Sequence, residues 1–543
     1  MSPTQKLDCN SLVVIGSGMA GLLAALLVAD TIPVILLTKE KASHSSTDLA
    51  QGGIAAVWDE KDSVDLHIAD TLNAGNGLCD REAVSILSQK SHESIQSLID
   101  FGVKFDKDKN GKYQLGLEGA HSIPRILHAG GDATGREIRK VLFDRVMEHE
   151  NIKLQENSQV TEIISEGGKV TGVQFRNSDL TLERIETDCV ILATGGAGQL
   201  FKYTSNPLVA TGEGVTLAYR AGADLMDLEF FQFHPTALSL PGKPNYLITE
   251  AMRGEGAVLR NSAGEAIMEN KHPLKDLAPR DIVARTIAYE LSKSPDNKVY
   301  LDVSMIASDR IENRFPTVFE SCLKCGLDIR EGQIPVTPVS HFMIGGVATD
   351  LWGRTTIEGF YACGEVARTG IHGSNRLASN SLLECIVFAS RINEALQLDR
   401  KQLPERWHFN SSSESTGENH IESPLGVLSL SEGFSKNVLQ KLVWDHAGLI
   451  RNRNSLEKLL RTLGQIPATP PEDHSEEEFS LHSLKLLAKL MGESALHRAE
   501  SRGSHFRDDF PLQSKKFRHP VVRNISETFY KQPKHHNYGT LSS

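Results

Sequence analysis

The strongest constraint on the fold lies near the start of the chain. The apolar run Leu12 to Ile15 is followed by GSGMAG, then by LLAALLVA, and then by a second apolar run from Val34 to Leu37. This order is typical of a strand, a glycine turn, a helix and a parallel strand. Gly16, Gly18 and Gly21 form GxGxxG, in which the glycines permit a tight turn, a close approach to a pyrophosphate and packing of helix on strand. We therefore expect a Rossmann-like, dinucleotide-binding unit.

The end of the second run does not identify the dinucleotide. An acidic residue for a ribose hydroxyl is expected about 20 residues after the glycines. Here Leu37 and Thr38 are followed by Lys39 and Glu40, so that a lysine stands about where the acid is expected. At this point both NAD and FAD remain open.

Two later apolar runs also end in glycines. Val190 to Ala193 precedes TGGAG, and Gly359 to Ala362 precedes CGEV. Because doubly wound sheets bind ligands at the carboxyl ends of their strands, we expect these two places and the first glycine turn to meet at one sheet edge.

The segment between these runs has a different character. Prolines stand at 235, 241, 244, 273 and 279, and the helix-like sequence PRDIVARTIAYEL follows. We predict an α/β protein whose nucleotide-binding domain is in two parts, residues 1–234 and 345–408. An inserted α+β capping domain covers 235–344, and a C-terminal helical domain with a tail covers 425–543.

The C-terminal part shows helical periodicity. A polar stretch at 410–420 predicts a linker or surface loop. Apolar residues then recur at helical spacing in two stripes, and these predict core helices rather than a membrane-binding surface. Ser475 and Glu478 form a capping box before the second stripe. The stripes are Leu456, Leu459, Leu460 and Leu463, which precede Gly464, and Leu481, Leu484, Leu487, Ala488 and Met491. The basic last stretch is expected to be a solvated tail.

Composition excludes several classes of function. The 543 residues are 40% hydrophobic and have a formal net charge of −11, which gives no footprint for nucleic acid. No apolar stretch approaches the length of a membrane span, and the first residues lack a secretory or transit pattern. Seven cysteines, an odd and sparse set, are typical of reduced thiols in a cytoplasm. Cys322 and Cys325 form a CxxC without further ligands at zinc spacing, so we assign them no function and predict no metal site.

The segment SHSSTDLAQGGIAA at 43–56 offers hydroxyl, amide and backbone donors for a flavin and its phosphates. Together with the glycine fingerprint and several later motifs, it resembles the flavoproteins of the succinate dehydrogenase, fumarate reductase and L-aspartate oxidase family. The resemblance runs from about residue 11 to 390, and ESRGSHFRDDFP at 500–511 is also similar. The later motifs are His234-Pro235-Thr236, RGEG from Arg253, APRD from Ala278, GGV from Gly345, Gly364-Glu365 and SNSLLE from Ser379.

The resemblance implies an FAD-binding domain and a set of cofactor contacts. Succinate dehydrogenase relatives have a histidine before the threonine of the 43–56 segment, which tethers the flavin. Here Ser46 precedes Thr47 and the nearest histidine is His44, so we predict non-covalent FAD. The expected contacts are Gly16, Ser17, Gly18, Met19, Ala20, Gly21, Lys39, Ser46, Thr47, Gln51, Gly52, Gly53, Glu213, Glu365, Ser381 and Leu382.

The resemblance also implies a four-carbon dicarboxylate as substrate. Such a dianion needs fixed cations and hydrogen-bond donors. Within the family motifs these are His234, Thr249, Arg280, His341 and Arg376. The family places the arginine at the position of Arg280 opposite the flavin N5, where it transfers the proton on the substrate carbon while the flavin exchanges hydride at the neighbouring carbon. Glu250 and Arg253 form either a relay to Arg280 or an ordinary ion pair.

One residue separates aspartate from succinate. Aspartate has an ammonium group, so its site needs an anion that a succinate site does not. Glu118, in LGLEGAHS, aligns with the glutamate that L-aspartate oxidases place near the substrate amine, and Asp132 to Gly135 is also similar to them. The resemblance thus implies oxidation of L-aspartate to iminoaspartate by hydride transfer to flavin. Dioxygen, giving hydrogen peroxide, or fumarate, giving succinate, would reoxidise the flavin. It implies the first step of NAD biosynthesis, with iminoaspartate passed to quinolinate synthase.

Three other functions are weighed against this one. A flavoprotein subunit of succinate dehydrogenase or fumarate reductase would need an iron–sulfur partner, and the missing histidine and Glu118 count against it. A flavoprotein that only relays electrons would leave the dicarboxylate residues idle. A nicotinamide-dependent dehydrogenase is the third alternative, and a yellow colour of the purified protein, which indicates bound flavin, would exclude it.

Overall fold

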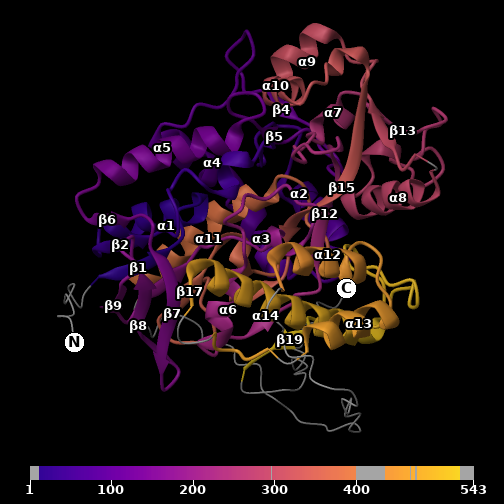
Figure 1. Ribbon diagram of the computed structural model, residues 1–543. Helices are drawn as coiled ribbons and strands as arrows, with labels where there is room; N and C mark the ends of the chain where they lie inside the picture. Colours follow the sequence, from indigo (N-terminus) through magenta and orange to yellow (C-terminus); the bar gives the residue numbers. More distant parts are fainter. Residues whose placement is uncertain (1–10, 295, 399–433, 465, 471–473, 526–543) are drawn as a thin grey trace, which may run out of the picture.

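A five-stranded parallel sheet forms the centre of the nucleotide-binding part in the computed structural model, which describes residues 11–294, 296–398, 434–464, 466–470 and 474–525. Every pairing in the sheet is parallel. The strand order is β17 (Phe360–Ala362), β10 (Val190–Leu192), β1 (Leu12–Ile15), β2 (Val34–Leu37) and β6 (Ile152–Gln155). The predicted strand, turn, helix and strand at the start are confirmed, and the three glycine-terminated runs lie side by side as β17, β10 and β1. Figure 1 shows β1, β2 and β6 next to one another on the side of the N-terminus.

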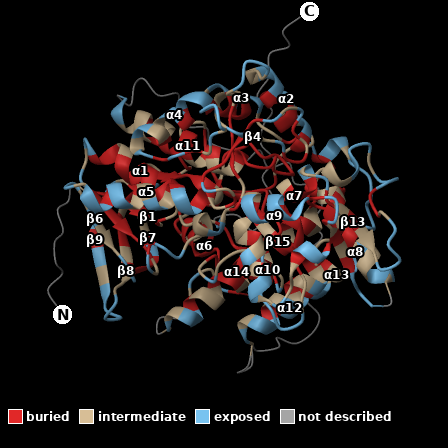
Figure 2. Ribbon diagram, turned by 90° about the horizontal axis from the view of Figure 1, so that it is seen from above, coloured by how far each residue is buried: buried red, intermediate tan, exposed pale blue. Residues whose placement is uncertain are grey.

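Alternate residues of β1 face two different cores, as the twofold period of a strand requires. Leu12 and Val14 pack in a core formed with helices, whereas Val13 and Ile15 pack in a core that includes an antiparallel sheet which the sequence analysis did not predict. The helices are α1 (Met19–Ala29), α5 (Thr134–Glu148) and α11 (Asn380–Gln397), and the sheet is β7 (Gln159–Glu166), β8 (Lys169–Arg176) and β9 (Leu182–Glu186). Figure 2 shows buried residues concentrated along α1, α11 and the strands between the exposed outer turns.

The remaining elements of the nucleotide-binding part are short. None of the helices among them is longer than 11 residues. These elements are η1 (Ser46–Leu49), β3 (Ile54–Ala55), α2 (Val64–Ala74), α3 (Arg81–Gln89), α4 (Ser91–Phe101), β4 (Leu115–Gly116), β5 (Ile126–Leu127), η2 (Gly198–Leu200), α6 (Glu213–Arg220), β11 (Leu225–Met226), β16 (Gly346–Ala348), η5 (Gly364–Val366) and β18 (Ala367–Arg368).

The inserted part is built on a four-stranded antiparallel sheet with its own apolar core. Its order is β12 (Phe231–Leu238), β15 (Gln333–Met343), β14 (Val299–Asp302) and β13 (Val258–Asn261). The helix expected from PRDIVARTIAYEL is α8, which begins after Pro279, and Cys322 of the CxxC is buried in α10. The helices are α7 (Ala251–Gly254), α8 (Arg280–Lys293), α9 (Ser308–Arg314) and α10 (Pro316–Lys324), with η3 (Lys275–Leu277) and η4 (Ile329–Glu331).

The C-terminal helices confirm both apolar stripes. The Ser475 and Glu478 capping box is present in full, and Gly464 follows the helix of the first stripe. Leu459, Leu484 and Leu487 are fully buried in the core that also contains Val13 and Ile15 of β1, so these helices pack on the nucleotide-binding part. The elements are α12 (Lys436–Ala447), α13 (Arg453–Leu463), α14 (Glu476–His497), η6 (Lys515–Phe517) and β19 (Val522–Arg523).

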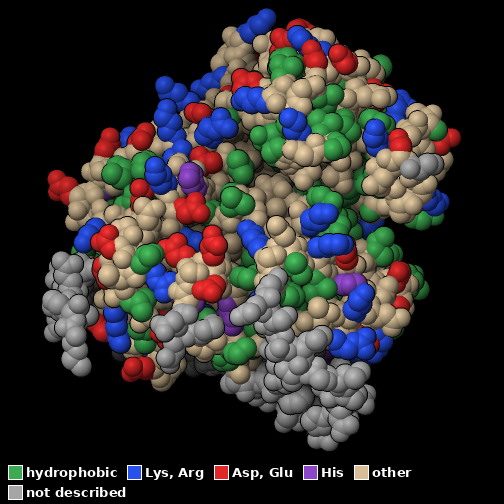
Figure 3. Space-filling view, viewed as in Figure 1, with side chains coloured by type: hydrophobic (Ala, Val, Ile, Leu, Met, Phe, Trp, Pro, Cys, Tyr) green, Lys and Arg blue, Asp and Glu red, His purple; other side chains and the backbone are tan. Residues whose placement is uncertain are grey.

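The predicted α/β architecture is therefore present, with a Rossmann-like parallel sheet, an inserted capping part and C-terminal helices. The predicted boundaries of the four segments stay predictions, and the linker expected at 410–420 lies outside the described residues, as do the first ten residues and most of the tail. Among the described helices, none is both long and apolar enough to cross a membrane. Figure 3 shows acidic and basic side chains interspersed over one face of the protein.

Candidate active site

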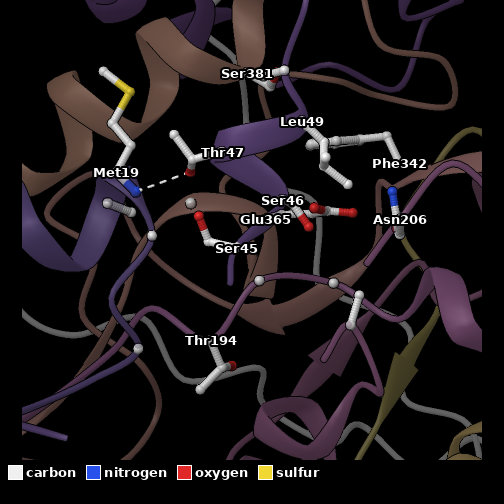
Figure 4. Close-up of a pocket in the computed structure, with 18 of the residues that line it drawn as sticks. Met19, Ser45, Ser46, Thr47, Leu49, Thr194, Asn206, Phe342, Glu365 and Ser381 are labelled. Atoms are coloured by element: carbon white, nitrogen blue, oxygen red, sulfur yellow. Dashed lines mark hydrogen bonds between the residues drawn. The ribbon is translucent and has the colours of Figure 1, made fainter. Parts of the chain in front are cut away.

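One deep pocket opens at the carboxyl edge of the parallel sheet. The residues that follow β1, β2, β10 and β17 all line it, as do β12 and β15 of the capping part through His234 and His341. In the close-up, Met19 and Thr47 lie on one side of the cavity and Asn206 and Phe342 on the other (Figure 4). The pocket therefore joins a dinucleotide site to residues of the inserted sheet.

The fingerprint glycines have separate physical roles. Gly16 has φ +109°, and a Cβ on it would lie 2.4 Å from the carbonyl oxygen of Ala193. A Cβ on Gly21 would lie 1.8 Å from the carbonyl oxygen of Gly16, so this glycine permits α1 to pack against the turn. A Cβ on Gly18 would contact only Thr47 Oγ1 at 3.4 Å, because its α-carbon faces the pocket. The absence of a side chain at Gly18 thus leaves space for a ligand. At Gly16 and Gly21 it permits close packing of the backbone.

The C-terminal helix α14 reaches the far end of this pocket. Lys39 follows β2 and donates to Glu213 Oε1 at 2.6 Å and to Ser480 Oγ of α14 at 2.9 Å. Ser480 in turn donates to Glu213 Oε1 at 2.5 Å. Glu213, the first residue of α6, therefore supplies the carboxylate at the place where the sequence pattern offers a lysine. A carboxylate is thus present beside Lys39, but it comes from another element.

Several polar atoms in the pocket fit FAD. The backbone N–H of Met19, at the N-terminus of α1, points to the site and donates to Thr47 Oγ1 at 3.1 Å. Gln51 Oε1 and Thr194 Oγ1 are buried without a hydrogen-bond partner among the described residues, so a bound polar group would satisfy them. Burial raises the pKa of Glu365 to about 7, although it accepts from the Met343 backbone.

Nearly all the predicted cofactor contacts line the pocket. The exception is Gly21, which packs α1 as described above. Ser46 occupies the position before Thr47, and His44 lines the pocket with its Nδ1 bonded to Glu40 Oε2 at 2.9 Å. The non-covalent attachment of FAD stays a prediction.

Two arginines form the substrate end of the pocket. Arg280 donates through Nε to Glu250 Oε2 at 2.6 Å and through Nη1 to Gln232 Oε1 at 3.1 Å. Arg376 donates through Nε to the same Gln232 oxygen at 3.2 Å and through Nη1 to Ser381 Oγ at 2.6 Å. Burial and repulsion by Arg280 lower the pKa of Arg376 to about 9, which reflects how strongly this end of the pocket favours an anion.

Glu250 connects Arg280 to Arg253 behind the pocket wall. Glu250 Oε1 lies 3.2 Å from Arg253 Nη2, and Arg253 also donates to the carbonyl oxygen of Asp276. Burial would raise the pKa of Glu250, but Arg280 and Arg253 outweigh it and lower the pKa to about 2, so this carboxylate is ionised. Arg253 is buried and does not line the pocket, so it acts on a ligand only through Glu250.

Two neutral histidines face the same space. The rings of His234 and His341 lie 5.2 Å apart, and His341 Nδ1 is 2.9 Å from Ser205 Oγ. Burial, together with the nearby Arg280, lowers the pKa of both well below the ordinary histidine value. They therefore add hydrogen-bonding capacity without further positive charge.

Glu118 lines the same end of the pocket, close to both arginines and next to the segment expected to hold the flavin. It accepts from Ser379 Oγ at 2.7 Å, and a Cβ on Gly52 would lie 3.4 Å from Glu118 Oε1. Burial, reinforced by Glu250, raises the pKa of Glu118. Thr249 also lines this end, so every expected substrate residue except Arg253 meets in one cavity.

Three residues of the site were missed by the sequence analysis. Gln232 joins the two arginines, and it shares a strand face with His234 at a spacing of two. This alternation in the sequence could have indicated that Gln232 faces the same side as His234. Ser379 holds Glu118 from a left-handed backbone with φ +63°, and Ser480 reaches Glu213 from α14. Ser379 opens the SNSLLE motif, but neither its contact with Glu118 nor that of Ser480 with Glu213 has a local signal, because the partners lie far away in the sequence.

Comparisons with known proteins agree with this geometry. The family described as "FAD binding domain" matches residues 11–382, and that described as "Fumarate reductase flavoprotein C-term" matches residues 436–524. The L-aspartate oxidase of Bacillus subtilis is 42% identical over 92% of this chain and 91% of its own length. That of Vibrio cholerae is 40% identical over 94% and 98%.

Solved structures show the same fold over nearly the whole chain. The FrdA chain of Escherichia coli quinol fumarate reductase has a TM-score of 0.83 with 27% identity, covering 98% of each chain. Mycobacterium smegmatis Sdh1 has a TM-score of 0.78 with 30% identity, covering 95% of this chain and 92% of its own. Fold and pocket thus define an FAD-binding flavoprotein. Within that class, the chain belongs to the L-aspartate oxidase family.

The two glycines Gly18 and Gly21 give a matched test of the pocket. We expect Gly18→Ala to fold as the wild type does but to bind FAD at least about tenfold more weakly, because its methyl group occupies ligand space. Gly21→Ala should lower the thermal stability of the apoprotein, because the methyl group meets backbone. Flavin fluorescence titration and thermal unfolding without FAD measure the two effects. Equal FAD affinity in Gly18→Ala and wild type would contradict this assignment.

Proposed function

We propose that the protein oxidises L-aspartate to iminoaspartate with FAD as its cofactor. FAD supplies the two-electron acceptor, and the residues described above hold it at the edge of the parallel sheet. The curated relatives that match over more than nine-tenths of the chain are L-aspartate oxidases, which supports this function.

The observation that supports this proposal best is the charge pattern at the substrate end. L-aspartate has two carboxylates and one ammonium group. Arg280 and Arg376 supply two guanidinium groups, and Glu118 supplies a carboxyl group in the same cavity. The arginines would each hold a substrate carboxylate while Glu118 pairs with the ammonium group. Succinate has no group that needs Glu118.

Arg280 has the geometry of a residue that both binds and moves a proton. Two of its nitrogens are held by Glu250 and Gln232, and Nη2 has no hydrogen-bond partner among the described residues. We assign Nη2 to a substrate carboxylate and, when fumarate is reduced, to delivery of the proton to its carbon. A guanidinium rarely releases a proton, so Glu250 and Arg253 behind it would replace that proton as it leaves.

The remaining groups orient the substrate. His234, His341 and Thr249 would donate or accept hydrogen bonds at the carboxylates without changing the charge of the site. The walls contributed by β12 and β15 exclude water from the reacting bond. Iminoaspartate hydrolyses readily, so its enclosure also protects the product.

We further propose the reactions that surround this step. Fumarate, giving succinate, or dioxygen, giving hydrogen peroxide, accepts the electrons from the reduced cofactor. Iminoaspartate passes to quinolinate synthase in the first step of NAD biosynthesis. The cysteines of the described residues are all free thiols, which supports a cytoplasmic location.

A succinate dehydrogenase or fumarate reductase subunit is the second candidate, and two residues disfavour it. Ser46 stands where those relatives have a tethering histidine, and Glu118 would meet only the uncharged methylene groups of succinate. An unpaired carboxylate in this position would cost binding energy rather than supply it.

Glu118→Gln separates the two candidates, because it keeps the shape and the Ser379 hydrogen bond but removes the charge. We expect kcat/KM for L-aspartate to fall by about a hundredfold or more, since a buried charge pair is lost, while fumarate reduction by a chemically reduced sample is retained. Arg280→Leu should lose both activities. Equal losses of both activities in Glu118→Gln would contradict the assignment of Glu118 to the ammonium group.

The raised pKa of Glu118 predicts a pH dependence specific to aspartate. Below this pKa the carboxyl group is neutral and cannot pair with the substrate ammonium group. We therefore expect kcat/KM for L-aspartate to rise with pH through the Glu118 pKa and then level off, at a pH above the ordinary glutamate range. In Glu118→Gln this rise of kcat/KM with pH, the acidic limb of the profile, should be absent. A limb that persists unchanged in the variant would assign it to another group.

A further inference from the structure

A second cleft, outside the active site, gathers positive charge at the junction of the nucleotide-binding and C-terminal parts. Its walls are the end of α2 with the loop that follows, the start of α3, and the segment around η6. The polar side chains that define this basic cleft are Asn73, Asn76, Arg81, Arg502, Gln513, Ser514, Lys515 and Arg518. No aspartate or glutamate is among the residues that line it.

Two guanidinium groups converge on one point of this cleft. Gly77 has φ +83° and no side chain, and a Cβ on it would lie 3.5 Å from Arg502 Nη1 and 3.6 Å from Arg518 Nε. Like charges brought this close repel each other, so their approach is favourable only with an anion nearby. Glycine at this position keeps the space between them open.

The buried arginine of the pair already has its anion. Arg502 donates to Glu500 at 2.8 and 2.9 Å, and its Nη1 donates to the Asn76 carbonyl oxygen and to Gln513. This arginine therefore fixes the loop at Asn76 to the C-terminal segment. Arg502 thus has a structural role in the cleft, and the positive charge available to a ligand comes from the other basic side chains.

The other three cations are uncompensated. Arg81, Lys515 and Arg518 are exposed, and none forms an ion pair with an acidic side chain in the part of the chain that the structure describes. Two carboxylates close to these cations in the sequence, Asp80 and Glu500, already have partners. Asp80 caps α3 by accepting from Glu82 and Ala83, and Glu500 accepts from Arg498, Arg502 and the Ser514 backbone.

We propose that the basic cleft binds a small oxyanion that has at least two negative charges. Guanidinium, ammonium and carboxamide groups are all donors suited to carboxylate or phosphate oxygens, and a protein with a net charge of −11 has little reason to gather unpaired cations otherwise. The same chemistry is found in a dicarboxylate and in a diphosphate group, so the experiment must distinguish these two sources.

The site also lies close to the scaffold of the active-site arginine. Segments next to the cleft hold Ser374, two residues before Arg376. Gly75 ends α2 just before the lining residue Asn76, and Ser504 lies two residues after the lining residue Arg502. Ser374 donates to the Gly75 carbonyl oxygen at 3.0 Å, and Ser504 donates to the Ser374 carbonyl oxygen at 2.9 Å. A bound anion would therefore rest on the segments that position Arg376.

The test is isothermal titration of the FAD-saturated protein at low ionic strength, with inorganic pyrophosphate and with succinate in separate runs. For a diphosphate site we expect one equivalent of pyrophosphate. For a dicarboxylate site we expect two equivalents of succinate, one of them in the active site. In Arg81→Gln/Arg518→Gln the affinity for the cleft ligand should fall by about tenfold or more, because two charge-assisted contacts are lost.

Arg136→Gln is the matched control, because Arg136 is also exposed and lies outside the cleft. It should bind both anions as the wild type does. Since all the substituted side chains are exposed, FAD absorbance and circular dichroism should match the wild type. The proposal is overturned if pyrophosphate does not bind and succinate binds with one equivalent. It is equally overturned if the double variant binds the cleft ligand, pyrophosphate or the second equivalent of succinate, as the wild type does.

Discussion

The buried charges at the substrate end of the pocket are the constraint on which the site depends. A guanidinium group removed from water is costly unless other groups replace its hydration. Arg280 and Arg376 meet this condition by sharing the Gln232 oxygen, while Glu250 pairs with Arg280 and Arg253 at once. Three arginines, Arg253, Arg280 and Arg376, thus share one firmly ionised carboxylate, Glu250, so this end of the pocket favours a ligand with two carboxylates. The positions of β12, β15 and α8 follow from the need to bring these groups to the sheet edge.

The second constraint is the continuity of the pocket across parts of the chain that are far apart in sequence. The cofactor end uses the strand ends of the parallel sheet, and α14 closes it through Ser480 and Glu213. The substrate end uses the antiparallel sheet of the inserted part. Because Leu487 of α14 and Val13 of β1 belong to one core, the C-terminal helices help to fix the cofactor end.

Sequence patterns predicted the parts of the protein that depend on local chemistry. The GxGxxG turn, the capping box at Ser475 and the apolar stripes were all readable, because each is fixed by neighbours within a few residues. The motif resemblance then assigned most pocket residues. What escaped was long-range. Ser480, Ser379 and the sheet β7–β8–β9 depend on partners that only folding brings near, and Lys39 could not reveal that Glu213 supplies the carboxylate beside it.

The most direct test of the account measures hydrogen peroxide from the purified, FAD-loaded protein in air, with L-aspartate and with succinate in separate samples. The account predicts peroxide with L-aspartate only, because Glu118 finds its ammonium partner in that substrate alone. Peroxide or dye reduction with succinate and none with L-aspartate would contradict it. That result would place the protein with the dicarboxylate dehydrogenases and leave Glu118 without its assigned role.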